Sequence, residues 1–257
     1  MITTIHSTAI VSPKAQLGEG VVVGPHVVID DDVIIGDGTT IKAHAYIANG
    51  ARIGKDCRIF QGAVISEEPQ DLKYDGAPTT VFIGDRTHIR EYVTVHRGTS
   101  SETTTIGSDC LIMSYCHVAH DCRVGSNVIM SNVTQLAGHV TVEDWVIIGG
   151  VAKIHQFCKL GCHSMIGADC KVVKDVSPYT LIGRSPSQVE GINKVGLRRR
   201  GFSAELIQEI ESFYDTILFS GFNNRDGIAK FLERGTISPE VQHCIDFINN
   251  SSRGIHR

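Results

Sequence analysis

The sequence predicts a mainly β protein, a parallel β-helix of hexapeptide repeats followed by a small α-helical C-terminal domain. Two patterns in the 257-residue chain carry this prediction. Aliphatic residues recur at every sixth position up to residue 172, with two interruptions, and capped helical segments replace that pattern after about residue 190. We therefore expect a β-helix over residues 1–189 and a helical domain over residues 190–257.

The six-residue pattern is continuous within each of its blocks. Every sixth residue from Ile5 to Ile65 is aliphatic, the phase resumes at Ile83, and after a slip it runs from Ile106 to Val172 with only aliphatic residues or Met. A second class of small or β-branched residues follows four positions later. This period fits neither a helix nor a simple strand, but it is typical of a β-helix in which three hexapeptides form one triangular coil. Residues 18 apart should then stack at about 4.8 Å.

Two polar segments interrupt the repeat and are predicted to be inserted loops. Residues 66–82 contain two prolines and have about the length of one coil without its pattern, and residues 97–105 form a shorter excursion. Loops that leave a rigid scaffold often carry binding and catalytic residues.

The C-terminal region contains three segments with helix signals. A helix is predicted after Ser203, which is followed by an acidic first turn, and another after Ser238, with Pro239 at its first position. A third is predicted over residues 226–233. We expect this domain to cover the open edge of the last coil.

Composition excludes several classes of protein. A net charge of −4 argues against a protein whose main partner is nucleic acid. The sequence shows no secretory signal and no run of 18 apolar residues, so we expect a cytoplasmic protein without membrane insertion. Because no CxxC pair occurs, we expect no metal site. Most cysteines instead fall at the small inward position of the repeat, where a free thiol packs as a compact apolar group, namely Cys57, Cys110, Cys116, Cys122, Cys158 and Cys170.

The candidate catalytic residues lie in the second half of the repeat. An 18-residue stack places His120 and Asp121 beside Gly138 and His139. A neutral imidazole oriented by a carboxylate is a suitable general base near neutral pH, and a glycine N–H beside it can stabilise an oxyanion. This combination indicates acyl transfer.

Six segments along the chain form a recognisable pattern of residue types: DLKYDGAPT (71–79), VTVHRGT (93–99), HVAHDCRVG (117–125), QLAGHV (135–140), KIHQFC (153–158) and GLRRRGFS (196–203). In this order and at these intervals they resemble the UDP-N-acetylglucosamine acyltransferases that begin lipid A biosynthesis. These enzymes belong to the hexapeptide-repeat acyltransferases, whose β-helix is left-handed, and the resemblance runs nearly from end to end.

The resemblance implies a homotrimer with active sites between subunits. An acyl carrier protein would supply an (R)-3-hydroxyacyl thioester, and the acceptor would be the 3-hydroxyl of UDP-N-acetylglucosamine. Direct attack needs neither a covalent enzyme intermediate nor a cofactor. On the matching positions His120 would be the general base, Asp121 its orienting partner and the Gly138 amide the oxyanion donor.

The resemblance also implies a set of substrate-binding residues. In the first loop, Gln70, Asp71 and Lys73 match residues that hold the sugar nucleotide. Ala168 matches the position that sets acyl-chain length, where a glycine leaves the groove open. The remaining matches are Asn193, Arg199 and Arg200 for the phosphate and uridine end, and His96, His117, His139, His155 and Gln156 along the same cleft. The run Arg198 to Arg200 is also a local basic cluster suited to a diphosphate or an acidic carrier protein.

Three alternatives remain open at this point. The first is an N-acyltransferase acting on an amino-sugar nucleotide, because the same base would serve an amine. The second is a zinc enzyme of the carbonic anhydrase type, in which His117, His120 and His139 would converge on the metal. The third is a purely structural solenoid, which leaves the histidine cluster unexplained.

Overall fold

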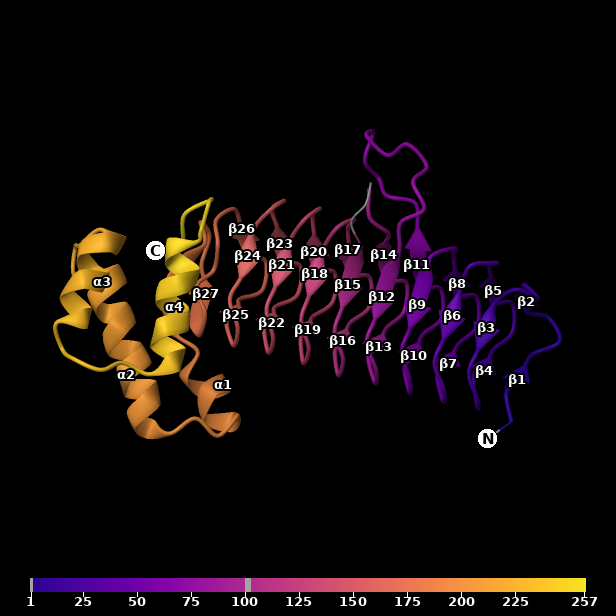
Figure 1. Cartoon of the computed structure of the whole chain (residues 1–257), viewed down its shortest axis with the longest axis horizontal. Coiled ribbons are helices and arrows are strands. Elements are labelled where there is room, and N and C mark those ends of the chain that lie inside the picture. The colour runs from indigo at the N-terminus through magenta and orange to yellow at the C-terminus, as the bar shows by residue number, and fades with distance from the viewer. Residues whose placement is uncertain (1, 100–102) are drawn as a thin grey trace.

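The computed structural model describes residues 2–99 and 103–257, and short strands stack within this part into three sheets, which are parallel except for the last strand pair of the first sheet (Figure 1). Sheet A contains β1 (Thr4–Ile5), β4 (Val22–Val23), β7 (Thr40–Ile41), β10 (Arg58–Ile59), β13 (His88–Ile89), β16 (Leu111–Ile112), β19 (Ile129–Met130), β22 (Ile147–Ile148), β25 (Met165–Ile166), β27 (Thr180–Gly183) and β28 (Gln188–Ile192). Sheet B contains β2 (Ile10–Val11), β5 (Val28–Ile29), β8 (Tyr46–Ile47), β11 (Val64–Glu67), β14 (Thr94–His96), β17 (His117–Val118), β20 (Gln135–Leu136), β23 (Lys153–Ile154) and β26 (Lys171–Val172). Sheet C contains β3 (Gln16–Leu17), β6 (Ile34–Ile35), β9 (Ala51–Ile53), β12 (Val81–Ile83), β15 (Thr104–Ile106), β18 (Arg123–Val124), β21 (Thr141–Val142) and β24 (Lys159–Leu160).

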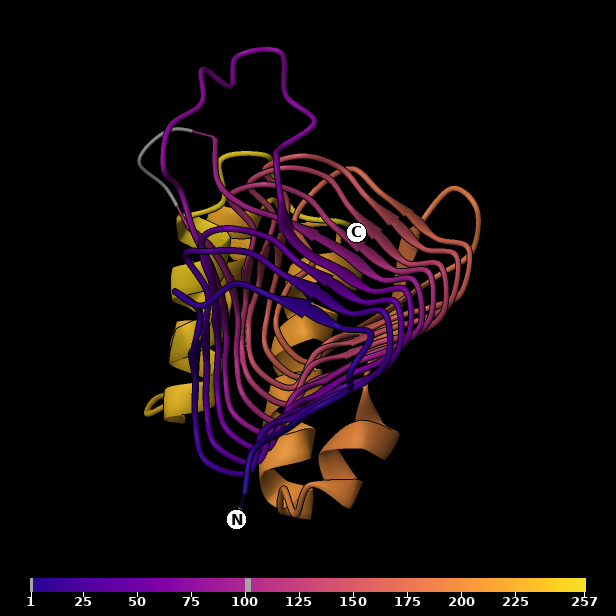
Figure 2. The same cartoon turned by 90° about the vertical axis from the view of Figure 1, so that its right-hand side faces the viewer.

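The coils superimpose as a triangular prism when the molecule is viewed along its long axis (Figure 2). The predicted 18-residue register is confirmed, because Val118 pairs with Leu136 and Leu136 with Ile154. The chain passes from sheet A to B, from B to C and from C back to A. We call the three corners the A–B, B–C and C–A edges.

Both inserted loops leave the prism at the B–C edge, between β11 and β12 and between β14 and β15. Figures 1 and 2 show the first loop projecting from this edge. Val64 pairs directly with Thr94, so the residues between β11 and β12 form no coil of their own. Of the second loop, residues 100–102 lie outside the described part of the chain.

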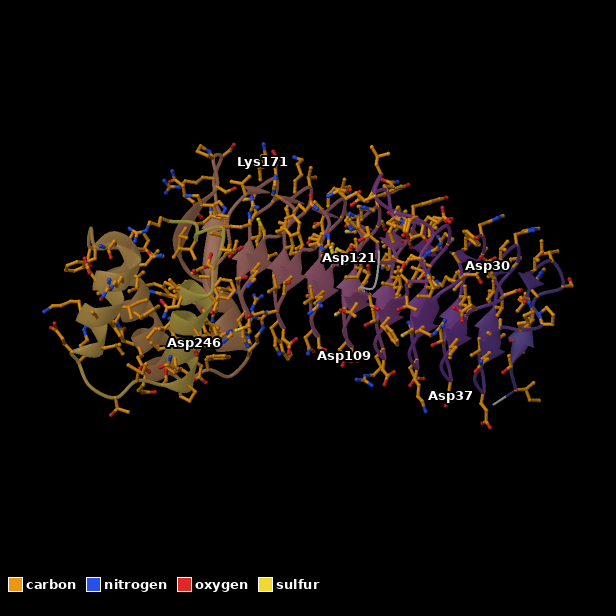
Figure 3. All side chains as sticks on the ribbon, turned by 45° about the horizontal axis from the view of Figure 1, so that its top comes forward. Asp30, Asp37, Asp109, Asp121, Lys171 and Asp246 are labelled. Carbon is orange, nitrogen blue, oxygen red and sulfur yellow. The ribbon has the colours of Figure 1, made fainter. Side chains whose placement is uncertain are left out.

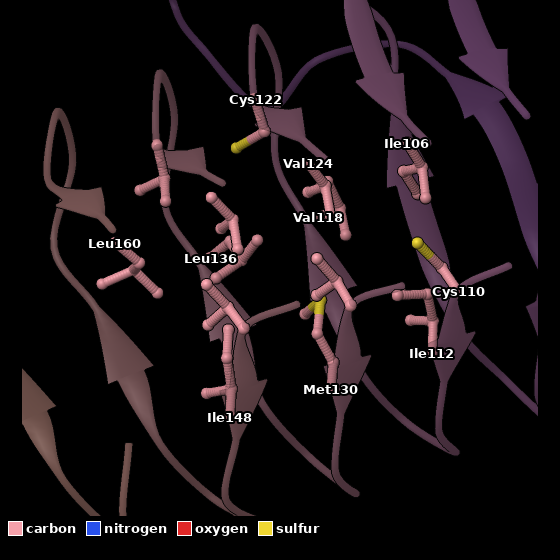
Figure 4. Close-up of a cluster of buried hydrophobic side chains, with 14 of the residues drawn as sticks. Ile106, Cys110, Ile112, Val118, Cys122, Val124, Met130, Leu136, Ile148 and Leu160 are labelled. Carbon is pink, nitrogen blue, oxygen red and sulfur yellow. The ribbon is translucent and has the colours of Figure 1, made fainter. Parts of the chain in front are cut away.

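The six-residue positions fill the interior of the prism (Figure 4). Ile5 is an exception, with 49% of its surface exposed, because no earlier coil packs against it. The inward cysteines are buried as predicted, and burial raises the pKa of Cys116 to about 11 and that of Cys122 to about 12. The thiols of Cys116 and Cys122 therefore stay protonated and act as packing groups.

Helices follow the last coil: α1 (Lys194–Arg199), α2 (Ala204–Tyr214), α3 (Asn224–Leu232) and α4 (Pro239–Asn249), with a π-helical turn η1 (Asp215–Phe219) after α2. Ser203 and Ser238 cap α2 and α4 as predicted, while α3 begins earlier than predicted because Asn223 caps it. Helix α1 and the antiparallel pair β27–β28 were not predicted. The domain boundary at residues 189 and 190 stays a prediction. None of the helices in the described residues has the length and apolar character needed to cross a bilayer.

Candidate active site

The central candidate residues lie at successive corners of the B–C edge. His120 and Asp121 follow β17, and Gly138 and His139 occupy the corresponding corner after β20. Asp121 and His139 adopt φ angles of 60° and 59°, the left-handed conformation by which each corner turns. The His139 N–H donates to the His120 carbonyl at 3.1 Å, so the two corners are stacked as the repeat predicts.

The His120 imidazole is buried, and its two nitrogens face different groups. Nδ1 lies 2.8 Å from Asp121 Oδ2, and Nε2 lies 3.7 Å from Asp71 Oδ2 on the first loop. A carboxylate at Nδ1 favours the tautomer with its proton on that nitrogen. Nε2 then carries a lone pair directed towards the loop, which is the arrangement a general base requires.

Asp121 is fixed by several donors near the middle of the solenoid (Figure 3). The Thr99 hydroxyl donates to Asp121 Oδ2 at 2.8 Å, and the Thr99 N–H donates to Oδ1 at 3.1 Å. Burial opposes ionisation of this carboxyl, but the hydrogen bonds from His120 and Thr99 outweigh it and lower the pKa of Asp121. Asp121 is therefore an anion at neutral pH.

Gly138 permits the position of the His120 ring. A methyl group at Gly138 would lie 2.4 Å from Cε1 and 2.6 Å from Nε2 of His120, which is far inside van der Waals contact. Among the described residues, the Gly138 N–H donates to no backbone carbonyl. A backbone hydrogen-bond donor, the Gly138 N–H, therefore lies beside the candidate general base, the His120 imidazole.

His139 stands on the other side of Asp121. Its Nε2 is 3.5 Å from Asp121 Oδ2, its ring is perpendicular to His120 at 5.2 Å, and it stacks on Phe157 at 4.7 Å. The ligand atoms of His120, Asp121 and His139 lie within 4.8 Å of one another, a set that can hold a divalent cation. His117, which the zinc alternative requires, lies outside this set, since its Nδ1 contacts Thr94 Oγ1 at 2.7 Å.

His96 and His117 form a second imidazole pair on sheet B. Their rings are perpendicular with centroids 4.9 Å apart. Burial lowers the pKa of both, that of His117 to about 4, and the nearby His96 and His120 contribute to the effect on His117. His117 is consequently neutral over the physiological range.

We expect this neutral His117 to make the fold sensitive to acid. Between pH 6.5 and about 4 the unfolded chain binds a proton at His117 that the folded chain does not, so stability falls as the pH falls. The Tm of the wild type should therefore drop by several degrees more between pH 7 and pH 5 than that of His117→Asn, measured by scanning calorimetry. Equal drops in the two proteins would contradict this assignment.

Arg97 joins the two loops, a role that sequence reasoning missed. Its guanidinium donates to the Tyr74 hydroxyl at 2.9 Å and to the Ser66 carbonyl at 2.9 Å, and it pairs with Glu68 at 3.2 Å. Thr99 was missed as well. Both lie in the segment VTVHRGT, and nothing in the residue types of this segment indicated that Arg97 or Thr99 would contact the first loop or Asp121.

Other predicted site residues extend this edge. Gln70 and Lys73 are exposed on the first loop, and the Lys73 N–H donates to Asp71 Oδ1 at 3.0 Å. His155 and Gln156 occupy the corner after β23, one coil beyond Gly138 and His139. The loop and three stacked corners thus face the same side of the prism.

The structure places four predicted residues away from the B–C edge. Arg200 Nη1 contacts His163 Nδ1 at 3.1 Å on the C–A edge, and the Asn193 amide donates to the His163 carbonyl at 3.0 Å while its oxygen caps α1. Arg199 is exposed at the end of α1, and Ala168 is exposed on the A–B edge. Within one chain these residues do not meet His120.

Comparison with known proteins agrees with this architecture. A family model described as UDP-N-acetylglucosamine O-acyltransferase, domain 2, matches residues 175–256, and one described as bacterial transferase hexapeptide (six repeats) matches residues 32–67 and 103–134. The UDP-N-acetylglucosamine acyltransferase of Bacteroides fragilis superposes with a TM-score of 0.97 at 44% identity, covering 99% of this chain and 100% of the other. The Arabidopsis enzyme superposes with a TM-score of 0.88 at 31% identity, with the same coverage. These matches confirm the predicted left-handed β-helix.

Relatives in sequence cover the chain completely. The acyl-[acyl-carrier-protein]–UDP-N-acetylglucosamine O-acyltransferase of Janthinobacterium sp. (strain Marseille) is 48% identical over 100% of both chains. The enzyme of the same name from Herminiimonas arsenicoxydans is 46% identical, again over 100% of both. Since identity at this level extends along the whole length, the chain belongs to the acyl-[acyl-carrier-protein]–UDP-N-acetylglucosamine O-acyltransferases.

Proposed function

We propose that this enzyme transfers an (R)-3-hydroxyacyl group from acyl carrier protein to the 3-hydroxyl of UDP-N-acetylglucosamine, as the first step of lipid A biosynthesis in the cytoplasm. The observation that carries the proposal is the His120 imidazole, with Nδ1 held by Asp121 and Nε2 facing the first loop. The reaction needs no cofactor.

In this mechanism His120 Nε2 removes the proton from the sugar 3-hydroxyl as its oxygen attacks the thioester carbonyl. The Gly138 N–H stabilises the tetrahedral oxyanion. When the intermediate collapses, the carbon–sulfur bond breaks and the carrier protein thiolate takes the proton from His120. The Asp121 carboxylate stabilises the imidazolium between these steps. No enzyme nucleophile takes part.

We propose that the substrate-binding site is completed by neighbouring subunits of a homotrimer. Asp71, Gln70 and Lys73 would bind the sugar nucleotide from the first loop, together with His96, His117, His139, His155 and Gln156 on the same edge. The diphosphate and uridine end of the sugar nucleotide would be bound by Asn193, Arg199 and Arg200. These residues can approach a His120 only if it belongs to another copy of the chain. A column of exposed apolar side chains on the A–B edge supports such an interface: Tyr92, Tyr115, Val133 and Val151 are 53%, 58%, 40% and 44% exposed.

Mass spectrometry of the product tests the proposal. The enzyme is incubated with UDP-N-acetylglucosamine and a panel of (R)-3-hydroxyacyl carrier proteins, and the 3-amino analogue of the sugar nucleotide is offered in parallel. We expect O-acylation of the hydroxyl sugar. Exclusive acylation of the amino analogue would instead support the N-acyltransferase alternative.

Ala168 gives a prediction about chain length. Ala168 matches the position at which a glycine leaves the acyl groove open, so its methyl group would narrow that groove. The residue is exposed beside Gly149 on the A–B edge. The change Ala168→Gly should shift competition between acyl carrier proteins towards a longer chain by about tenfold, since a pocket discriminates a methylene by this order. An unchanged preference would rule out this role.

A further inference from the structure

A second cluster of metal-binding side chains lies on the C–A edge, where α4 packs against the last coils (Figure 1). Glu143 follows β21, Cys162 follows β24, and His243 comes from α4, 100 residues after Glu143. One ligand atom from each lies within 4.8 Å of the others. This cluster lies on the C–A edge, whereas His120 lies on the B–C edge.

The contacts within the cluster hold its members in place. His243 Nε2 is 2.9 Å from Glu143 Oε2, and the Cys162 N–H donates to the same oxygen at 2.8 Å. All three side chains are partly exposed, so solvent and ions reach them. The backbone N–H of Cys162 therefore orients the Glu143 carboxylate, and the Cys162 thiol lies beside that carboxylate.

Cys162 differs from the chain's other cysteines. It is the one cysteine of eight that is not fully buried. The others serve as packing groups, whereas Cys162 lies at an outward corner position beside an imidazole and a carboxylate. Cys162 packs against the core with only part of its side chain, and the ion pair between His243 and Glu143 does not require a thiol beside it.

We propose that Glu143, Cys162 and His243 bind a divalent transition metal, with Zn²⁺ the best fit. Thiolate, imidazole and carboxylate are the ligands that zinc accepts, and three of them leave a fourth tetrahedral position for water. Ligands around zinc lie roughly 3.3–3.8 Å apart given its bond lengths, so small side-chain adjustments close the site. The side chains of Cys162 and Glu143 raise the pKa of His243 to about 10, so metal binding releases to solvent both the thiol proton and the imidazolium proton of His243, whose freed nitrogen then binds the ion. The metal would fasten α4 to the β-helix.

Cobalt substitution tests the site in the full-length protein. Titration with Co²⁺ should produce a thiolate-to-cobalt charge-transfer band in the near ultraviolet that saturates at one ion per chain, and Zn²⁺ should abolish it. The band should be absent in Cys162→Ser and weakened at least tenfold in apparent affinity in His243→Gln. Both variants keep a polar side chain of similar size at a partly exposed position, which favours folding.

The other metal-binding set supplies the control. His139→Asn removes a ligand from the set around Asp121 and should leave the cobalt band unchanged. Zn²⁺ should raise the Tm of wild type and His139→Asn by about 5 °C at a hundredfold excess over Kd, and should not raise that of the double variant Cys162→Ser/His139→Asn. A wild-type protein without the band, or a Cys162→Ser protein that retains it, would overturn the proposal.

Discussion

Replacing His120 with alanine is expected to lower kcat/KM by about 10²- to 10⁴-fold, the contribution of a positioned general base. The residue is the one imidazole of the B–C edge that contacts carboxylates through both nitrogens within the described residues. Without it, no side chain at this corner is positioned to take the proton of the acceptor hydroxyl. Steady-state kinetics with UDP-N-acetylglucosamine and an acyl carrier protein thioester measure the effect.

Two further measurements separate catalysis from folding and binding. His44→Ala is a matched control, since His44 also occupies a corner with a φ of 61° but stacks on His26 away from the B–C edge. We expect its activity and Tm to equal those of the wild type. The affinity of His120→Ala for UDP-N-acetylglucosamine, measured by titration calorimetry, should differ from that of the wild type much less than its kcat does. Activity of His120→Ala above a tenth of wild type would refute general-base catalysis by this residue.

Most of the fold follows from the six-residue period, because each hexapeptide packs only against the coils before and after it. The pairing of His120 with Gly138 could be predicted for the same reason, since the register is constant within a block of repeats. The hairpin β27–β28 could not, because it lies beyond the repeat and its antiparallel pairing has no six-residue signal.

The parts of the site that depend on irregular backbone were also beyond prediction. Thr99 contacts Asp121 across 22 residues, a separation outside the 18-residue stacking, and Arg97 contacts Tyr74, which lies on the first loop. His243 meets Glu143 through the docking of α4, across a separation of 100 residues. Local patterns of residue type carry no information on such contacts.

Gly138→Ala is expected to lower kcat/KM by about 10²-fold or more, because displacing a catalytic group by about 1 Å costs this much. The added methyl would lie 2.6 Å from His120 Nε2, and the ring cannot move away without lengthening its 2.8 Å contact with Asp121. The substitution keeps the backbone N–H, so a loss does not come from removal of the proposed oxyanion donor. Crystallography of the variant should show His120 displaced while the stacked coils remain in place.

The double variant His120→Ala/Gly138→Ala separates displacement of the His120 imidazole from any other effect of the added methyl group. If the methyl group acts only by displacing the imidazole, it has nothing to displace once His120 is alanine, and the double variant should be no slower than His120→Ala. Losses that multiply would mean that the methyl group also acts independently of His120, for instance by displacing the backbone N–H of residue 138. A double-mutant cycle on kcat/KM therefore measures how much of the glycine's role is to leave room for the base.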